Sequence, residues 1–321
     1  MEYRILTGTG VTVSRIALGT MTFGGQVNEQ DACNIVNKAI DLGITYIDTA
    51  NSYFDGVSEN YVGKAIRGKR DKVILASKVG NTSGKGNATG LSRRHITAEM
   101  DKSLKELDTD YLDIYYLHKP DYNTPVEETL ETMTTLVKAG KVRYIGLSNF
   151  SSWQTCETLW ISDKRNGIAP SLTQNVYNLL TRGIEQELVP CLRKFNVGLV
   201  IYNPLAGGFL SGKHLPGKPA ADTRFDVNTT YKDRYWTDEN FNALAKLKDI
   251  ADEAGITVLE LAMRWCASQA HVDSIIAGVT STSQLEQNAA SIEKGTLSED
   301  TLKACDEVWK SVSENRFKYN R

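Results

Sequence analysis

The stretch Gly43-Ile44-Thr45-Tyr46-Ile47-Asp48-Thr49-Ala50 follows an amphipathic segment, residues 29–42. Gly43 stands where a helix would end, because a left-handed backbone conformation is least costly for glycine. The apolar run at residues 46–50 is short and is typical of a buried strand. This order of helix, glycine and strand predicts one unit of an alternating helix–strand fold.

The same pattern recurs along the whole chain. Strict alternation of strands and helices predicts a parallel sheet. Six of the seven intervals between successive strand ends are 27 to 39 residues long, and the last is 74. Eight such units most simply close a (β/α)8 TIM barrel, an α/β fold of one domain spanning residues 1–321, with a doubly wound open sheet as the alternative. The expected strands are residues 15–20, 46–50, 73–79, 111–118, 142–149, 171–178, 198–205 and 274–279, and the expected helices are residues 29–42, 59–67, 93–107, 126–139, 152–164, 184–195, 239–253, 258–268, 282–292 and 299–312.

Two segments lie outside this alternation. Residues 211–236 are rich in Gly, Pro and charged side chains and predict a long loop after the seventh strand, of the kind that forms lids or binding loops. Residues 4–13 contain Thr7-Gly8-Thr9-Gly10 and predict an N-terminal β-hairpin. The two glycines do not form a dinucleotide fingerprint, because Val13 stands at the third glycine position and no helix follows.

The composition excludes several classes of protein. The chain has 37 Lys plus Arg and 39 Asp plus Glu, a net charge of −2 that argues against a general nucleic-acid binder. No apolar run approaches the ~20 residues of a membrane span, and no signal-peptide core is present at the start. The five cysteines form no C-x-x-C pair and the four histidines no H-E-x-x-H pair, so we expect neither a disulfide framework nor a metal site, and a cytoplasmic setting.

Four titratable residues follow or end three adjacent strands. Asp48 ends the second strand, Tyr53 follows it, Lys78 ends the third and His118 ends the fourth. The carboxyl ends of barrel strands carry the active site. An ammonium beside a tyrosine stabilises tyrosinate, and a neutral histidine can orient a carbonyl by hydrogen bonding. Each residue alone could be a solvated strand end, but the group of four predicts proton transfer to a carbonyl oxygen.

The chain resembles the aldo-keto reductase superfamily over nearly its whole length. The resemblance implies the barrel and a nicotinamide cofactor bound without a Rossmann domain. The segments that carry it are Leu18-Gly19-Thr20-Met21, the run 43–50 with Tyr53, Ser77-Lys78, Leu117-His118, Ile145-Gly146-Leu147-Ser148-Asn149, Gln174-Asn175, Tyr202-Asn203-Pro204-Leu205-Ala206-Gly207-Gly208 and Gly278-Val279-Thr280-Ser281 through Gln287-Asn288.

By this resemblance, Tyr53 is the proton donor, Lys78 and Asp48 tune it, and His118 directs the substrate carbonyl. Hydride would pass from the reduced nicotinamide to the carbonyl carbon, so that an aldehyde or ketone becomes an alcohol. Two alternatives stay open. Some barrels of this family are regulatory subunits of membrane channels that bind NADPH with little turnover. The other alternative is a biosynthetic role, in which the physiological reaction runs as oxidation of an alcohol or on a sugar or vitamin carbonyl.

The resemblance also implies a set of cofactor residues. Ser148, Asn149 and Gln174 resemble the group that binds the carboxamide, and Tyr202 resembles the ring that stacks on the nicotinamide. The turn at residues 204–208 would bring backbone N–H groups to the pyrophosphate. The full set is Gly19, Thr20, Met21, Asp48, Ser148, Asn149, Gln174, Tyr202, Asn203, Pro204, Leu205, Ala206, Gly207, Gly208, Lys213, Arg224, Gly278, Thr280, Ser281, Gln284, Gln287 and Asn288.

The chain departs from much of the family just after the last strand. Many members have Lys or Arg there to bind the 2′-phosphate of NADPH, whereas residues 278–281 are uncharged. Arg224 in the long loop is the expected replacement, and its alternative is a solvated loop cation. NADPH is therefore the expected cofactor, with NADH open.

Residues 54–59, 206–213 and 231–236 resemble the branch that reduces aflatoxin dialdehyde and succinic semialdehyde. In that branch a C-terminal arginine meets a substrate carboxylate, a part that Arg321 would take; the alternative is a basic tail. The expected partner is a small carbonyl substrate, and self-association is left open. The expected substrate-pocket residues are Met21, Phe54, His118, Tyr235, Trp236 and Arg321.

Overall fold

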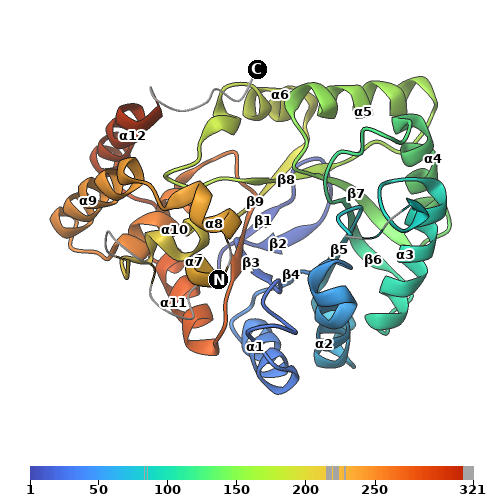
Figure 1. Cartoon of the computed structure of the whole chain (residues 1–321), viewed down its shortest axis with the longest axis horizontal. Coiled ribbons are helices and arrows are strands. Elements are labelled where there is room, and N and C mark those ends of the chain that lie inside the picture. The colour runs from blue at the N-terminus through green and yellow to red at the C-terminus, as the bar shows by residue number, and fades with distance from the viewer. Residues whose placement is uncertain (83, 85, 215–218, 220–223, 228, 314–321) are drawn as a thin grey trace.

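Eight parallel strands form a closed barrel in the computed structural model, which describes residues 1–82, 84, 86–214, 219, 224–227 and 229–313. The strand order is β10-β3-β4-β5-β6-β7-β8-β9, so neighbours in sequence are neighbours in space and the last strand closes on the first (Figure 1). The predicted barrel is confirmed. The strands are β3 Ile16–Gly19, β4 Tyr46–Asp48, β5 Ile74–Val79, β6 Leu112–Leu117, β7 Val142–Ser148, β8 Leu172–Val176, β9 Gly198–Tyr202 and β10 Ser274–Gly278.

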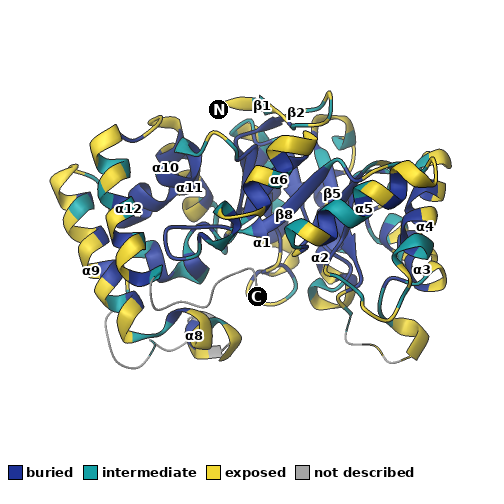
Figure 2. Cartoon of the chain, turned by 90° about the horizontal axis from the view of Figure 1, so that it is seen from above, coloured by how far each residue is buried: buried dark blue, intermediate teal, exposed yellow. Residues whose placement is uncertain are grey.

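Helices surround the barrel and turn their buried faces inward (Figure 2). Polar side chains fix where several of them begin: Asn28, Ser92, Ser151, Thr257 and Ser281 each accept a hydrogen bond from a backbone N–H of the first turn. The helices are α1 Glu29–Asp41, α2 Val57–Ile66, α3 Arg93–Glu106, α4 Val126–Lys138, α5 Ser152–Lys164, α6 Leu188–Phe195, α9 Asp238–Glu253, α10 Val258–Ser268, α11 Thr282–Glu293 and α12 Glu299–Ser313.

The predicted N-terminal hairpin is confirmed and closes the amino end of the barrel. Strands β1 (Tyr3–Ile5) and β2 (Thr12–Ser14) pair antiparallel. Leu6 and Val13 are fully buried in one apolar cluster with side chains of the barrel strands. Gly8 has φ +78°, and a Cβ there would lie 2.5 Å from the carbonyl oxygen of Asn196, so only glycine fits this turn.

The segment between β9 and α9 contains two short helices, α7 (Arg224–Val227) and α8 (Thr229–Tyr235). The composition of residues 211–236 predicted a loop and did not predict these two helices. Phe225 and Tyr235 are buried, and they hold the described part of the segment against the barrel. In the described part of the chain, no helix is long and apolar enough to span a membrane, and no group of three metal-binding side chains is placed to hold an ion.

Candidate active site

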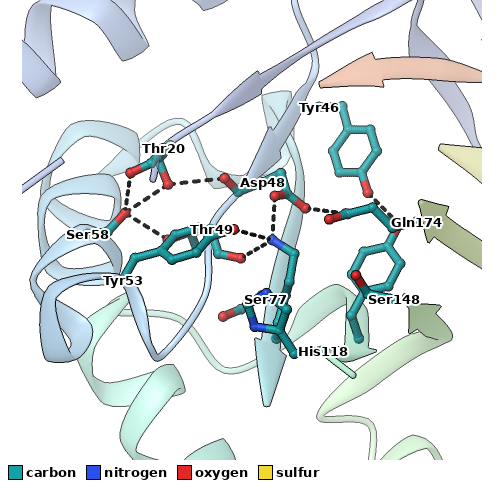
Figure 3. A network of polar contacts seen from close by, with 12 residues as sticks. Thr20, Tyr46, Asp48, Thr49, Tyr53, Ser58, Ser77, His118, Ser148 and Gln174 are labelled. Carbon is teal, nitrogen blue, oxygen red and sulfur yellow. Dashed lines mark hydrogen bonds and ion pairs between the residues drawn. The ribbon is translucent and has the colours of Figure 1, made fainter. Parts of the chain in front are cut away.

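The four titratable residues predicted from the sequence meet at the carboxyl end of the barrel, where Lys78 contacts Asp48 and Tyr53, and Tyr53 lies against His118. Figure 3 shows Asp48, Tyr53 and His118 at this site. Asp48 is the last residue of β4, Lys78 lies near the end of β5, and His118 directly follows β6. Tyr53 begins a short 3-10 turn, Tyr53–Gly56, in the loop after β4. Parallel strands of one barrel end at the same face, and this geometry converts distant positions in the sequence into one cluster.

Lys78 and Asp48 form a buried ion pair. Nζ of Lys78 donates to Oδ1 of Asp48 and, at 2.8 Å, to the backbone carbonyl of Thr49. The two side chains are only 1% and 3% exposed, so the pair is shielded from water. Burial raises the pKa of Asp48, although Lys78 opposes this. Burial would lower the pKa of Lys78, but Asp48 and Tyr53 outweigh it and hold that pKa above its ordinary value.

A third contact fixes the carboxylate from the other side. Nε2 of Gln174 donates to the second oxygen of Asp48 at 2.8 Å. Gln174 lies on β8, across the barrel from β4, so the contact spans the mouth of the barrel. The carboxylate thus binds one cation and one amide, an arrangement that keeps Lys78 charged and in place.

Tyr53 lies within reach of this ammonium. Its Oη accepts a hydrogen bond from Nζ of Lys78 at 3.3 Å, and Nζ lies 5.0 Å from the ring centre. Burial raises the pKa of Tyr53 above 10, and Lys78 lowers it in part. We expected from the sequence that Lys78 would lower this pKa, and the opposing effect of burial is larger. Tyr53 therefore holds its proton at neutral pH, and Lys78 is placed to stabilise the anion that forms when the proton leaves.

His118 faces Tyr53 and is neutral. The two rings lie 6.0 Å apart between centres, at 79° to each other. Burial, aided by Lys78 and Lys119, puts the pKa of His118 well below 6.5. Asn149 fixes the backbone here, because its Nδ2 donates to the carbonyl oxygen of His118 at 2.9 Å. A neutral imidazole beside a phenol suits hydrogen bonding to a carbonyl oxygen.

Helix α2 anchors the turn that carries Tyr53. Ser58, in the first turn of α2 and five residues after Tyr53, lies 2.8 Å from the hydroxyl of Thr20 and 3.0 Å from that of Thr49 (Figure 3). It also donates to the carbonyl oxygen of Thr20 at 2.9 Å. The turn itself is left-handed at Phe54 and Asp55, with φ of 49° and 55°. We did not single out Ser58 from the sequence, because its role depends on contacts across three elements.

A cleft of about 950 Å³ opens above the cluster. It has the form expected for a ligand site, since it is concave and lined by several polar groups. Most of the predicted cofactor residues line it. From the predicted sets the lining includes Gly19, Thr20, Met21, Asp48, Tyr53, His118, Ser148, Asn149, Gln174, Tyr202, Asn203, Pro204, Leu205, Gly207, Gly208, Lys213, Gly278, Thr280, Gln284, Gln287 and Asn288.

The lining suits a dinucleotide. Oη of Tyr202 donates to Oδ1 of Asn149 at 2.7 Å, which fixes an amide and an aromatic ring side by side. Gly207 and Gly208 have φ of +72° and +102°, and a Cβ on Gly208 would meet nothing, so backbone is open to the cleft there. Gln284 of the first turn of α11 lines the cleft, and a helix N-terminus attracts phosphate.

The family model of the aldo/keto reductase family matches residues 15–310. The chain belongs to this family. It is therefore an oxidoreductase that acts on carbonyl compounds, with a nicotinamide cofactor as is general in the family. The predicted family resemblance is confirmed.

Named relatives of this aldo/keto reductase carry two kinds of description. Aflatoxin B1 aldehyde reductase member 2 of Homo sapiens is 35% identical, over 100% of this chain and 94% of its own length. The probable voltage-gated potassium channel subunit beta of Arabidopsis thaliana is also 35% identical, over 91% of this chain and 92% of its own length. An uncharacterized oxidoreductase of Bacillus subtilis is 35% identical, over 96% of both chains.

Some predicted residues of this aldo/keto reductase lie away from the cleft. Tyr235 is 3% exposed and accepts a hydrogen bond from Nδ2 of Asn203 at 2.8 Å, so it contacts the cleft wall from behind. Trp236 packs on Phe225, with ring centres 5.2 Å apart. Among the other predicted residues, Ala206 is buried, and Phe54 packs next to Gly25 and is 48% exposed. Ser281 lines a smaller hollow beside α1. The side chain of Arg224 and all of Arg321 lie outside the described residues.

The cleft wall also contains polar residues that were not predicted, among them Lys119, Asn81, Tyr231 and Arg234. Lys119 follows His118 directly, and Asn81 follows β5. Tyr231 and Arg234 lie on α8, with the guanidinium 6.0 Å from the tyrosine ring centre. For Lys119 and Asn81, the only signal in the sequence was their position after a strand. Tyr231 and Arg234 lie in the insertion, and only the folded helix α8 shows that they line the cleft.

Proposed function

We propose that this aldo/keto reductase uses NADPH to reduce an aldehyde or ketone to an alcohol, with Tyr53 as the proton donor. The observation that carries the proposal is the contact of Oη of Tyr53 with the buried, charged Nζ of Lys78 at 3.3 Å. A phenol with an ordinary pKa of ~10 is a weak acid at neutral pH, and a fixed ammonium makes its anion less costly.

Tyr53, His118 and the Lys78–Asp48 pair have different roles in this reaction. The substrate carbonyl oxygen binds where Tyr53 and His118 both face the cleft, and both donate hydrogen bonds to it. When bound, the reduced nicotinamide supplies hydride to the carbonyl carbon. Tyr53 gives its proton to the oxygen, and the charge of Lys78 stabilises the tyrosinate. Asp48 holds Lys78 in position through this step.

Amides and backbone would hold the cofactor along most of its length. Ser148, Asn149 and Gln174, which line the cleft, would bind the carboxamide, and Tyr202 would stack on the ring. The 2′-phosphate needs a cation, and residues 278–281 offer none. We assign this part to Lys213, which lines the cleft, and to Arg224.

Arg224→Ala tests this assignment. NADPH should bind at least about tenfold more weakly, which corresponds to loss of one charge-assisted contact of about 1.4 kcal/mol or more, and NADH should bind as before. Fluorescence titration of both cofactors measures the effect, with Lys232→Ala in the exposed part of α8 as the matched control. Equal losses for NADPH and NADH would remove Arg224 from the 2′-phosphate site.

Anionic aldehydes are the proposed substrates. Lys119 and Arg234 line the cleft that also holds Tyr53 and His118, so a carboxylate on the substrate would find a cation in the same cleft as the reacting carbonyl. Arg321 would add a third cation. The activity test is a panel of aldehydes with and without a carboxylate, mixed with NADPH and then NADH, followed by loss of nicotinamide absorbance. Bound cofactor without turnover across the panel would contradict the proposal.

A second candidate function has support from the relatives that are described as channel subunits. In this function the chain binds NADPH and turns over little, as a regulatory subunit of a membrane channel. Both functions use the same cleft, so the site geometry alone does not separate them. Co-purification with a membrane protein, together with single-turnover kinetics far slower than cofactor release, would favour the channel subunit.

A further inference from the structure

Helices α5 and α6 bring together two cysteines that are 35 residues apart in the sequence. Sγ of Cys156 in α5 lies 3.4 Å from Sγ of Cys191 in α6. Both cysteines are free thiols and both are half-buried, so a small solute can reach them from solvent. The sulfurs are in van der Waals contact, and a disulfide of ~2.05 Å requires only a small further approach.

The two thiols face each other because of how the helices pack. Ser152 and Glu187 form a second contact between the same two segments, with Oγ of Ser152 donating to Oε2 of Glu187 at 3.2 Å. Each of these residues lies four positions before its cysteine, and residues four apart share one face of a helix. The two segments therefore meet along matched turns, and α5 and α6 lie side by side in both overall views (Figures 1 and 2).

We propose that Cys156 and Cys191 form a reversible oxidation site, at which a hydroperoxide converts the two thiols into a disulfide that joins α5 to α6. This site is separate from the proposed active site and does not depend on the proposed reduction of carbonyl compounds. The cysteines are scattered in the sequence and predict no disulfide framework, but the fold places two of them in contact.

The chemistry balances with hydrogen peroxide as the oxidant. The thiolate sulfur of Cys156 attacks one peroxide oxygen, the O–O bond breaks, and the second oxygen leaves as water after taking up a proton. Cys156 is then a sulfenic acid. The sulfur of Cys191 attacks the sulfur of Cys156, the S–O bond breaks, and a second water leaves with the proton of Cys191. Two thiols and one peroxide give one disulfide and two waters.

The two cysteines have different parts in this sequence. Burial, together with the neighbouring Cys156, raises the pKa of Cys191 to about 12. Its thiolate fraction is therefore small at neutral pH, and attack on peroxide in solution would be slow. Attack on a sulfenic acid already in contact is intramolecular, so Cys191 is suited to that second step.

The test exposes the purified full chain to a small excess of hydrogen peroxide, blocks the remaining thiols under denaturing conditions, and maps the peptides by mass. We expect the peptides that contain Cys156 and Cys191 to be joined and lighter by two hydrogen atoms, and to separate again with dithiothreitol. Cys156→Ser and Cys191→Ser should each abolish the joined peptide, and Cys33→Ser, which removes another half-buried cysteine, should leave it unchanged.

Three results would overturn the proposal: both thiols still open to blocking after peroxide, a disulfide between two molecules in place of the internal one, or sulfinic acid at Cys156 with Cys191 free. If a serine variant fails to fold, peptide mapping of the unaltered chain still decides, because it needs no substitution.

Discussion

The two ends of the barrel differ in what they bury. The carboxyl end buries an ion pair, Lys78 with Asp48, whose side chains are at most 3% exposed. The amino end is closed by the β1–β2 hairpin, and there Leu6 and Val13 are fully buried in an apolar cluster. Apolar burial stabilises the fold, whereas a buried ion pair adds little to stability after desolvation. The amino end therefore stabilises the fold, whereas the carboxyl end buries charges that add little stability and that belong to the proposed active site.

The largest effect should follow from Lys78→Met. Removing the ammonium leaves Asp48 as an unpaired buried charge, so we expect a loss of about 3–5 kcal/mol in the free energy of unfolding at neutral pH. Turnover should fall by roughly 10²–10⁴-fold, because Tyr53 loses the charge that stabilises its anion. Urea denaturation and steady-state kinetics measure the two effects.

The double variant Asp48→Asn/Lys78→Met is the control for this prediction. With both charges removed, most of the stability should return while turnover stays low. Recovery of turnover together with stability would mean that the ion pair acts only on the fold, and the contrast between the two ends would then fail.

At the amino end, Leu6→Ala should act on the fold alone. Truncating this fully buried side chain should cost about 2–5 kcal/mol of unfolding free energy, with turnover per folded molecule unchanged. Its neighbour gives a matched control: Ile5 is 62% exposed, so Ile5→Ala should stay within about 0.5 kcal/mol of the unaltered chain. A drop in turnover for Leu6→Ala while the protein is folded would show that the two ends are coupled.

A smaller, pH-dependent effect should come from Glu59, which is buried in α2 beside the catalytic end. Its Oε1 accepts a hydrogen bond from Ser77 at 2.5 Å, and burial raises the pKa of Glu59 to about 7. The folded state therefore binds more protons than the unfolded state between about pH 4.5 and pH 7, and stability contributed by Glu59 is lost as the pH rises through this range.

Glu59→Gln should remove this dependence. The stability of the unaltered chain relative to the variant should fall by up to about 3 kcal/mol between about pH 5 and pH 8, as measured by urea denaturation at each pH. Glu299→Gln, at a site where the side chain is 91% exposed, is the control and should show no such trend. A constant difference between the unaltered chain and Glu59→Gln would mean that Glu59 is already ionised in the fold.

The sequence was sufficient to predict structural features that repeat along the chain and polar residues that lie at strand ends. Eight strand positions, all but the last at regular intervals, predicted the barrel, and the polar residues Asp48, Lys78 and His118 at strand ends predicted the cluster at its mouth. Such features depend on local pattern and on one global rule, that parallel strands end together.

What the sequence did not predict depends on packing between distant segments. The insertion after β9 has a composition typical of a loop, yet burial of Phe225 and Tyr235 accompanies short helices there. Tyr235 and Trp236 were expected in the substrate pocket, and the structure instead packs Trp236 in an aromatic cluster. The contact of Cys156 with Cys191 is of the same kind, since no spacing in the sequence signals that two helices bring them together.

The most direct test of the central claim is the turnover rate of Tyr53→Phe at saturating NADPH and aldehyde, with the dissociation constant of NADPH measured on the same sample. The substitution removes only the hydroxyl that contacts Lys78. We predict that turnover falls by roughly 10²–10⁴-fold while NADPH binds as tightly as before. A variant that keeps its turnover would contradict Tyr53 as the proton donor, and with it the assignment of the carboxyl end to catalysis.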